Sequence, residues 1–118
     1  YKTKADAVSQ AEIYRQSYAI TVCRGEHVQN PTIVGAQAAN ELLNIKGVKA
    51  SFVLTPYNGK IFVSARSIDE ANVQVVMERM GGGGHMNMAG CQLECDIPDG
   101  IVIIKRTLDT MIEEGELS

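Results

Sequence analysis

Four consecutive glycines, Gly81 to Gly84, separate a helical pattern from an extended one. Glycine loses more backbone entropy on folding than other residues, and one glycine in a left-handed conformation is enough to end a helix. The remaining glycines need another reason. Either the main chain there approaches a bound group closely, or the run is a surface loop without function. The flanks favour close approach, because the run continues into a compact, partly apolar segment, residues 85–90.

Alternating helix and strand patterns lie on both sides of this run. Apolar stripes at helical spacing predict helices over residues 4–14, 31–45, 67–80 and 98–114. Short β-branched or alternating runs predict strands over 18–23, 48–54, 60–64 and 91–95. Because Asn58-Gly59 favours a tight turn, the second and third strands form a hairpin. Since hairpin and crossover connections both occur, the order predicts an α/β sandwich, a mixed sheet of four or five strands with flanking helices.

Two of the expected helices carry start signals. Pro31 suits a first helical turn, with Asn30 available as a cap. Ser67 and Glu70 have the spacing of a capping box, in which each side chain satisfies a free main-chain N–H. Small residues such as Gly35 allow the helix over 31–45 to lie close against a sheet.

Composition limits the partners of this chain. Its 118 residues fit one domain, 1–118. The net charge of −3 gives no positive field that would attract a long polyanion, so we expect no long nucleic acid as a partner. Aromatic residues make up only 5%, so platforms for stacking bases are scarce. A small anionic ligand remains possible, because main-chain N–H groups and one arginine can hold a phosphate.

Cysteine usage and hydropathy indicate a cytoplasmic domain. Cys23, Cys91 and Cys95 give an odd count without paired spacing, so we expect reduced thiols and neither a disulfide framework nor a zinc site. No apolar run approaches the roughly 20 residues of a membrane helix. The chain begins with Tyr1 and not with Met, which suggests a piece of a longer protein.

The glycine run and its flank provide the first group of candidate binding residues. The main-chain N–H groups of Gly82, Gly83 and Gly84 can form a concave nest around phosphate oxygens. His85 can donate a further hydrogen bond to the same anion, or to a ribose or base. Asn87 adds an amide that can orient the ligand.

A second group follows a predicted strand. Ser64 and Arg66 lie where the strand 60–64 ends, the usual edge for ligand sites in α/β sheets. Arg66 presents a planar fork that suits a phosphate, although an exposed structural arginine is the alternative. The only histidines are His27 and His85, and no cluster fits metal-assisted hydrolysis. We therefore expect no catalytic residue, no metal ligand and no bound cofactor in this chain.

These motifs resemble a known family. Ser64-Ala65-Arg66-Ser67, the helix 72–80, the Gly-Gly-Gly-Gly-His run and Met88-Ala89-Gly90 are similar to the C-terminal DHH-associated domain of DHH-family phosphodiesterases. The likeness is greatest to the GdpP-like cyclic di-AMP phosphodiesterases, which are membrane-anchored enzymes of Gram-positive bacteria. It covers nearly the whole chain and is specific over residues 60–92.

The resemblance implies a role in catalysis shared with another domain. The substrate, cyclic di-AMP, would lie between this cytoplasmic domain and a DHH domain of the same polypeptide, which would hold manganese and complete the hydrolysis to a linear dinucleotide. Carried over by position, Gly82, Gly83, Gly84 and His85 contact the substrate and Arg66 meets a phosphate. The resemblance thus implies that the isolated chain is inactive.

Other functions are compatible with the same residues. One is a nucleic-acid-binding module like the related C-terminal domain of alanyl-tRNA synthetases, although the acidic charge and few aromatics argue against it. Others are an oligoribonuclease or exonuclease domain of the same superfamily, and a dimerisation domain in which the glycines permit tight packing of a homodimer.

Overall fold

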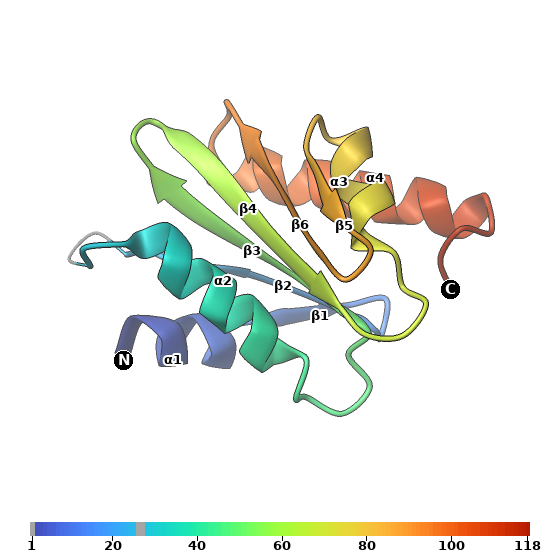
Figure 1. Cartoon of the computed structure of the whole chain (residues 1–118), viewed down its shortest axis with the longest axis horizontal. Coiled ribbons are helices and arrows are strands. Elements are labelled where there is room, and N and C mark those ends of the chain that lie inside the picture. Colours follow the sequence, from blue (N-terminus) through green and yellow to red (C-terminus); the bar gives the residue numbers. More distant parts are fainter. Residues whose placement is uncertain (1, 26–27) are drawn as a thin grey trace.

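The computed structural model describes residues 2–25 and 28–118, and its centre is a six-stranded mixed sheet with the order β1-β2-β3-β4-β6-β5 (Figure 1). Only β2 and β3 run parallel, and every other neighbouring pair is antiparallel. The strands are β1 (Glu12–Tyr14), β2 (Tyr18–Val22), β3 (Ala50–Tyr57), β4 (Lys60–Ser67), β5 (Gly83–His85) and β6 (Met88–Leu93).

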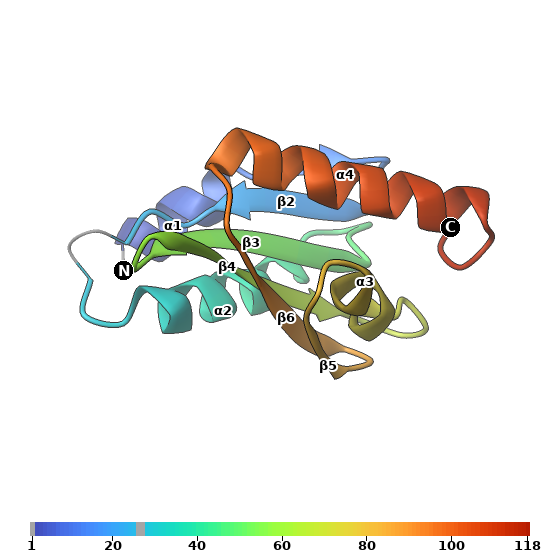
Figure 2. The same ribbon diagram turned by 90° about the horizontal axis from the view of Figure 1, so that it is seen from above.

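Four helices cover the two faces of the sheet. One face carries α1 (Lys2–Ser9) and α2 (Pro31–Leu42), and the other carries α3 (Val73–Arg79) and α4 (Ile97–Glu113). Figure 2 shows α4 and α2 on opposite sides of the strands. The predicted α/β class with a mixed sheet is therefore confirmed.

The central strands are buried on both faces. In β3, Phe52 and Leu54 pack toward α3 and α4, whereas Val53 packs toward α1 and α2. Because successive side chains of a strand alternate between faces, a strand covered on both sides is apolar throughout. Side chains also alternate in β4, but only one of its faces is fully buried: residues 61, 63 and 65 lie in the core, whereas residues 62, 64 and 66 are half-buried.

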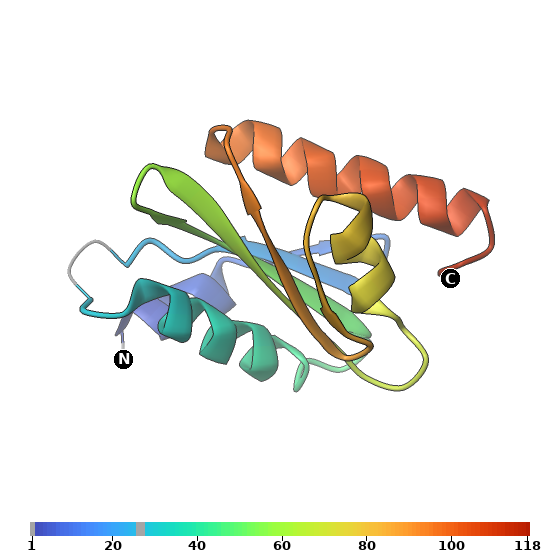
Figure 3. The same ribbon diagram turned by 45° about the horizontal axis from the view of Figure 1, so that its top comes forward.

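Helix α2 covers only part of its face. It packs on β3 and β4, and an added Cβ at Gly35 would overlap the Thr55 Oγ1, so the predicted close approach of this helix is confirmed. Beyond it, β6 and β5 extend with none of the described helices over them on this side (Figure 3). We call the uncovered side of β4, β6 and β5 the open face.

The N-terminal segment differs from its expected structure. Residues 12–14 form the edge strand β1 and do not continue a helix. With β5, which the sequence did not predict either, the sheet has six strands and not four or five. The hydroxyl of Tyr14 donates to both carboxylate oxygens of Asp109 in α4, at 2.8 and 2.9 Å. A contact 95 residues distant in sequence thus overrides a local helix propensity.

The capping box predicted at Ser67 is wrong. Ser67 is the last residue of β4, and α3 is capped by Asn72, whose Oδ1 accepts a hydrogen bond from the Val75 N–H at 3.3 Å. Asn30 does precede α2, but its side chain makes no capping hydrogen bond. The helix beginning at Pro31 is confirmed, and it ends at Leu42 rather than at residue 45.

The glycine run forms a helix end and a strand. Gly81 adopts a φ of +91° just after the last turn of α3, and the Gly82 N–H donates to the Met77 carbonyl at 2.8 Å. An added Cβ at Gly82 would overlap the carbonyl oxygen of Gly90 in β6. Gly81 therefore ends the helix, and Gly82 lets the chain turn back against β6.

The last two glycines of the run differ from each other. Gly84 has a φ of +145°, and a Cβ there would lie 2.6 Å from the Ala89 Cα. Gly83 has no positive φ, and a Cβ there would meet nothing within 4 Å. Contacts among the described residues therefore require glycine at 82 and 84 but not at 83.

We expect alanine substitutions in this run to separate these roles. Gly82→Ala and Gly84→Ala should each lower the free energy of unfolding by about 1–3 kcal/mol, because the methyl group overlaps β6. Gly83→Ala is the matched control and should change it by less than about 0.5 kcal/mol. Urea unfolding followed by circular dichroism measures all three, and equal losses would contradict the assigned contacts.

Candidate functional site

Alternation along β4 directs two predicted residues to the open face. Ile61, Val63 and Ala65 point into the core beneath α3 and α4. Ser64 and Arg66 therefore point to the opposite side, and both are half-buried. The predicted position at the very end of a strand is corrected, because β4 continues through Ser67.

Two rows of residues cross the three strands of the open face. Arg66 is paired with Met88, and Met88 with His85. The next row joins Ser64, Gly90 and Gly83 in the same way. Directly opposite residues in antiparallel strands share a face, so Arg66 and His85 lie on one side of the sheet.

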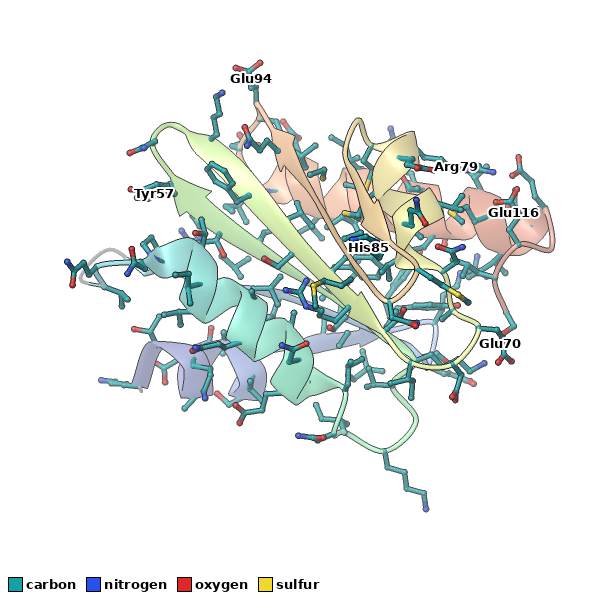
Figure 4. The ribbon with its side chains drawn as sticks, viewed as in Figure 1. Tyr57, Glu70, Arg79, His85, Glu94 and Glu116 are labelled. Carbon is teal, nitrogen blue, oxygen red and sulfur yellow. The ribbon has the colours of Figure 1, made fainter. Side chains whose placement is uncertain are left out.

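The second row forms a shallow depression in the open face, because two of its three residues are glycines without a side chain. We call Ser64, Gly90 and Gly83 the glycine trough. It runs beside the row that contains Arg66 and His85, and Figure 4 places His85 at β5, over the side of the sheet that faces the viewer. His85 is exposed, so its imidazole is accessible to a ligand.

Arg66 has a positive charge without a counter-ion among the described residues. Its Nε is fully covered yet has no hydrogen-bond partner there, and its Nη1 donates only to the neighbouring Ala65 carbonyl, at 2.9 Å. Burial lowers the pKa of the guanidinium, which nevertheless stays charged at neutral pH. Because the Nε is covered, an anion would bind through the terminal N–H groups of this half-buried cation, which has no other charge to pair with among the described residues.

An open hollow of about 490 Å³ adjoins the glycine trough. It crosses β4 and β6 from the first turn of α2 to the glycine run, and its side-chain lining includes Thr32, Phe62, Ser64 and Gln92. Arg66 and His85 do not line it, since they belong to the neighbouring row. A separate hollow of about 270 Å³, lined in part by Tyr18, Lys49 and Ser118, contains none of the predicted residues.

Of the residues that line the hollow, the sequence candidates include only Ser64 and Gly82, and Phe62, Thr32 and Gln92 are among those missed. The alternation of side chains along β4 could have identified Phe62, because residues 62, 64 and 66 are each two apart and so point to the same face. Thr32 and Gln92 come from α2 and β6, and only the tertiary fold brings them together. No local pattern marks either of them.

Asn87 makes contacts within the fold. Its Nδ2 donates to the Ser67 Oγ at 2.9 Å and to the Asp69 carbonyl at 3.2 Å. Both amide donors thus hold the β5–β6 turn against the β4–α3 connection. The predicted substrate contacts of Asn87, Gly82 and Gly84 stay predictions, and each of these residues has a structural role beside them.

The described residues offer neither a metal centre nor an activated thiol. No group of three or more His, Cys, Asp or Glu side chains in residues 2–25 and 28–118 could hold a metal ion, so manganese does not fit there. His27 lies outside the described residues. The three cysteines are free, and burial raises the pKa of Cys91 to about 11, which keeps it protonated at neutral pH. In the same residues no helix has the length and apolar character needed to cross a membrane.

Solved structures share this fold. An exopolyphosphatase-related protein from Bacteroides fragilis superposes with a TM-score of 0.83 at 19% identity, over 93% of this chain and 34% of that one. The C-Ala domain of Aquifex aeolicus alanyl-tRNA synthetase superposes with a TM-score of 0.63 at 17% identity, over 84% of this chain and 97% of that one. At these identities the likeness shows the architecture alone.

Sequence comparison shows the family. The DHHA1 domain model matches residues 16–113. Cyclic-di-AMP phosphodiesterase PdeA of Listeria monocytogenes serotype 1/2a (strain 10403S) is 41% identical over 95 residues, 80% of this chain and 14% of the relative. Cyclic-di-AMP phosphodiesterase GdpP of Geobacillus thermodenitrificans is 40% identical over 95 residues, 79% of this chain and 14% of the relative. The expected resemblance is confirmed, and the chain belongs to the DHHA1 domain family.

Proposed function

We propose that this chain is the substrate-binding part of a phosphodiesterase that hydrolyses cyclic di-AMP to a linear dinucleotide. The observation that carries the proposal is the half-buried guanidinium of Arg66, which has no counter-ion among the described residues and shares a row of the open face with His85 beside the glycine trough. The two relatives named above are cyclic di-AMP phosphodiesterases, which supports this choice of substrate.

The geometry suggests how a phosphate would be held. Arg66 can direct two N–H groups at phosphate oxygens, and His85 can donate another hydrogen bond from the same row. Gly83 leaves room for the phosphate to approach the main chain. Because β5 is an edge strand, the N–H groups of Gly83–His85 that point away from β6 have no partner strand and can also contact an anion. These groups bind and orient the substrate.

Catalysis requires a second part in this proposal. The matched region is 14% of the length of the named relatives. We infer that a DHH domain of the same polypeptide holds the manganese and activates the water, and that the parent protein is anchored in the membrane with this domain on the cytoplasmic side. The net charge of −3 argues against the alternative of a long nucleic-acid partner.

Removal of the positive charge of Arg66 should weaken the binding of cyclic di-AMP. We expect Arg66→Ala to raise the Kd for cyclic di-AMP about tenfold or more, because a charge-assisted hydrogen bond contributes roughly 1.5–3 kcal/mol. His85→Ala should raise it less, and Arg66→Lys should lie between Arg66→Ala and the wild type, since it keeps the charge without the fork. Amide chemical shifts followed during titration give the Kd. Arg106→Ala, an exposed site on α4, is the control, and an equal effect there would contradict the assignment.

Gly83→Ala tests whether the trough must stay empty. The added methyl group points onto the open face, so it should raise the Kd for cyclic di-AMP about tenfold by holding the phosphate away from the main chain. Unfolding in urea should be unchanged, as argued above. Unchanged affinity would show that no ligand approaches β5 at this position.

The isolated chain should not hydrolyse cyclic di-AMP. Its described residues provide no metal centre, so manganese added to the purified chain should give no linear dinucleotide by chromatography. In the parent protein, Arg66→Ala should lower kcat/KM while leaving the chain folded. Manganese-dependent turnover by the isolated chain would place the catalyst within it and contradict the proposed division.

A further inference from the structure

The hollow beside the glycine trough presents two side chains that the proposed phosphate contacts do not use. Phe62 of β4 and Gln92 of β6 are cross-strand partners, so both point to the open face. They line the hollow together with Thr32. A ring and a free amide side by side are the groups that recognise a planar, hydrogen-bonding ligand such as a nucleobase.

The separation of these side chains from Arg66 suits a nucleotide. Phe62 and Arg66 are four residues apart on β4, so at about 3.3 Å per residue they are roughly 13 Å apart along the strand. Ser64 lies midway, in the glycine trough. A phosphate near the Arg66 guanidinium therefore leaves its sugar over the trough and its base between Phe62 and Gln92. The long arginine side chain covers part of the distance.

Phe62 is placed to serve as the stacking surface. The other phenylalanine, Phe52, is fully buried in the core, whereas Phe62 is half-buried and lines the hollow. Its ring centroid is 6.0 Å from that of Tyr57, with an interplanar angle of 58°. This tilted contact limits the motion of the Phe62 ring, and Tyr57 lies at the β3–β4 turn (Figure 4).

Gln92 has the hydrogen-bonding pattern that matches adenine. Its exposed amide carries an acceptor and a donor, which complement the N6 amino group and N7 of adenine. Guanine presents two acceptors, O6 and N7, at the same edge, and arginine is the side chain that pairs with those. An amide at this position therefore favours adenine over guanine.

We propose that Phe62 and Gln92 form an adenine subsite, in which Phe62 stacks on the base and Gln92 sets the preference for adenine over guanine. The proposal rests on the proposed function, because it takes the phosphate to lie at Arg66. It identifies the part of this chain that distinguishes one cyclic dinucleotide from another, a property that the phosphate contacts cannot provide.

Gln92→Arg tests the subsite through a ratio of affinities. The Kd values of cyclic di-AMP and cyclic di-GMP are measured for the chain by titration, and wild type should bind cyclic di-AMP more tightly. In Gln92→Arg we expect this preference to fall about tenfold, since a bidentate pair discriminates by roughly 1–3 kcal/mol. The ratio removes the effect of the added charge, because both ligands carry the same charge. Gln10→Arg, an exposed position at the end of α1, is the matched control and should leave the ratio unchanged.

Two further variants test the same idea with less change in charge. Gln92→Leu removes both the donor and the acceptor of the amide at similar size and should also reduce the preference for adenine. Phe62→Leu should weaken both ligands about tenfold while leaving their ratio near that of wild type, because stacking does not depend on the base. Circular dichroism confirms that each variant is folded, and Gln92→Leu gives the answer if Gln92→Arg does not fold.

The outcomes separate this proposal from the proposed function. If Arg66→Ala weakens binding while both Gln92 variants keep the wild-type ratio, the adenine subsite is overturned and the phosphate site stands. If neither Arg66→Ala nor His85→Ala changes the Kd, or if the chain binds neither ligand, the proposed function fails and the subsite fails with it.

Discussion

The candidate site depends on the close contact between the main chain of the glycine run and β6. Side chains at Gly82 and Gly84 would overlap Gly90 and Ala89, so only glycine lets β5 lie in register as the sixth strand. That register places His85 opposite Met88, and Met88 opposite Arg66. A steric requirement between two backbones thus determines that His85 lies in the same row of the open face as Arg66. Without it, His85 and Arg66 would have no fixed relation.

Strand β4 combines a structural face and a binding face. Its inward side chains are apolar and pack beneath α3 and α4. Its outward side includes Arg66, whose covered Nε has no partner within residues 2–25 and 28–118. A buried donor without a partner is rare and costs free energy, and the packing on the inward face of the same strand offsets this cost. The half-buried side chain and its hydrogen bond to the Ala65 carbonyl limit the conformations of the charge, which reduces the entropy lost on binding.

Sequence patterns predicted the features that local chemistry determines. The sequence predicts the Asn58-Gly59 turn, the proline at the start of α2 and the α/β class, and the structure confirms all three, because the patterns behind them are local. The family motifs identified Arg66 and His85 as candidates. Patterns do not predict contacts between distant residues: β1 pairs with β2, and its Tyr14 reaches Asp109 in α4. The sequence predicts a concave nest of N–H groups for the glycine run, whereas its strand geometry depends on residues of β6 that no local rule includes.

The alternation of β4 also bears on how such domains diverge. Positions 61, 63 and 65 contribute to the core, while positions 62, 64 and 66 face outward. Substitution at the outward positions leaves the apolar interior untouched, so the side chains that face a ligand can change without loss of the folded state. A domain with this arrangement can accept substitutions on its binding face and still fold. One architecture can then host different functions, and the two solved structures named above share this fold.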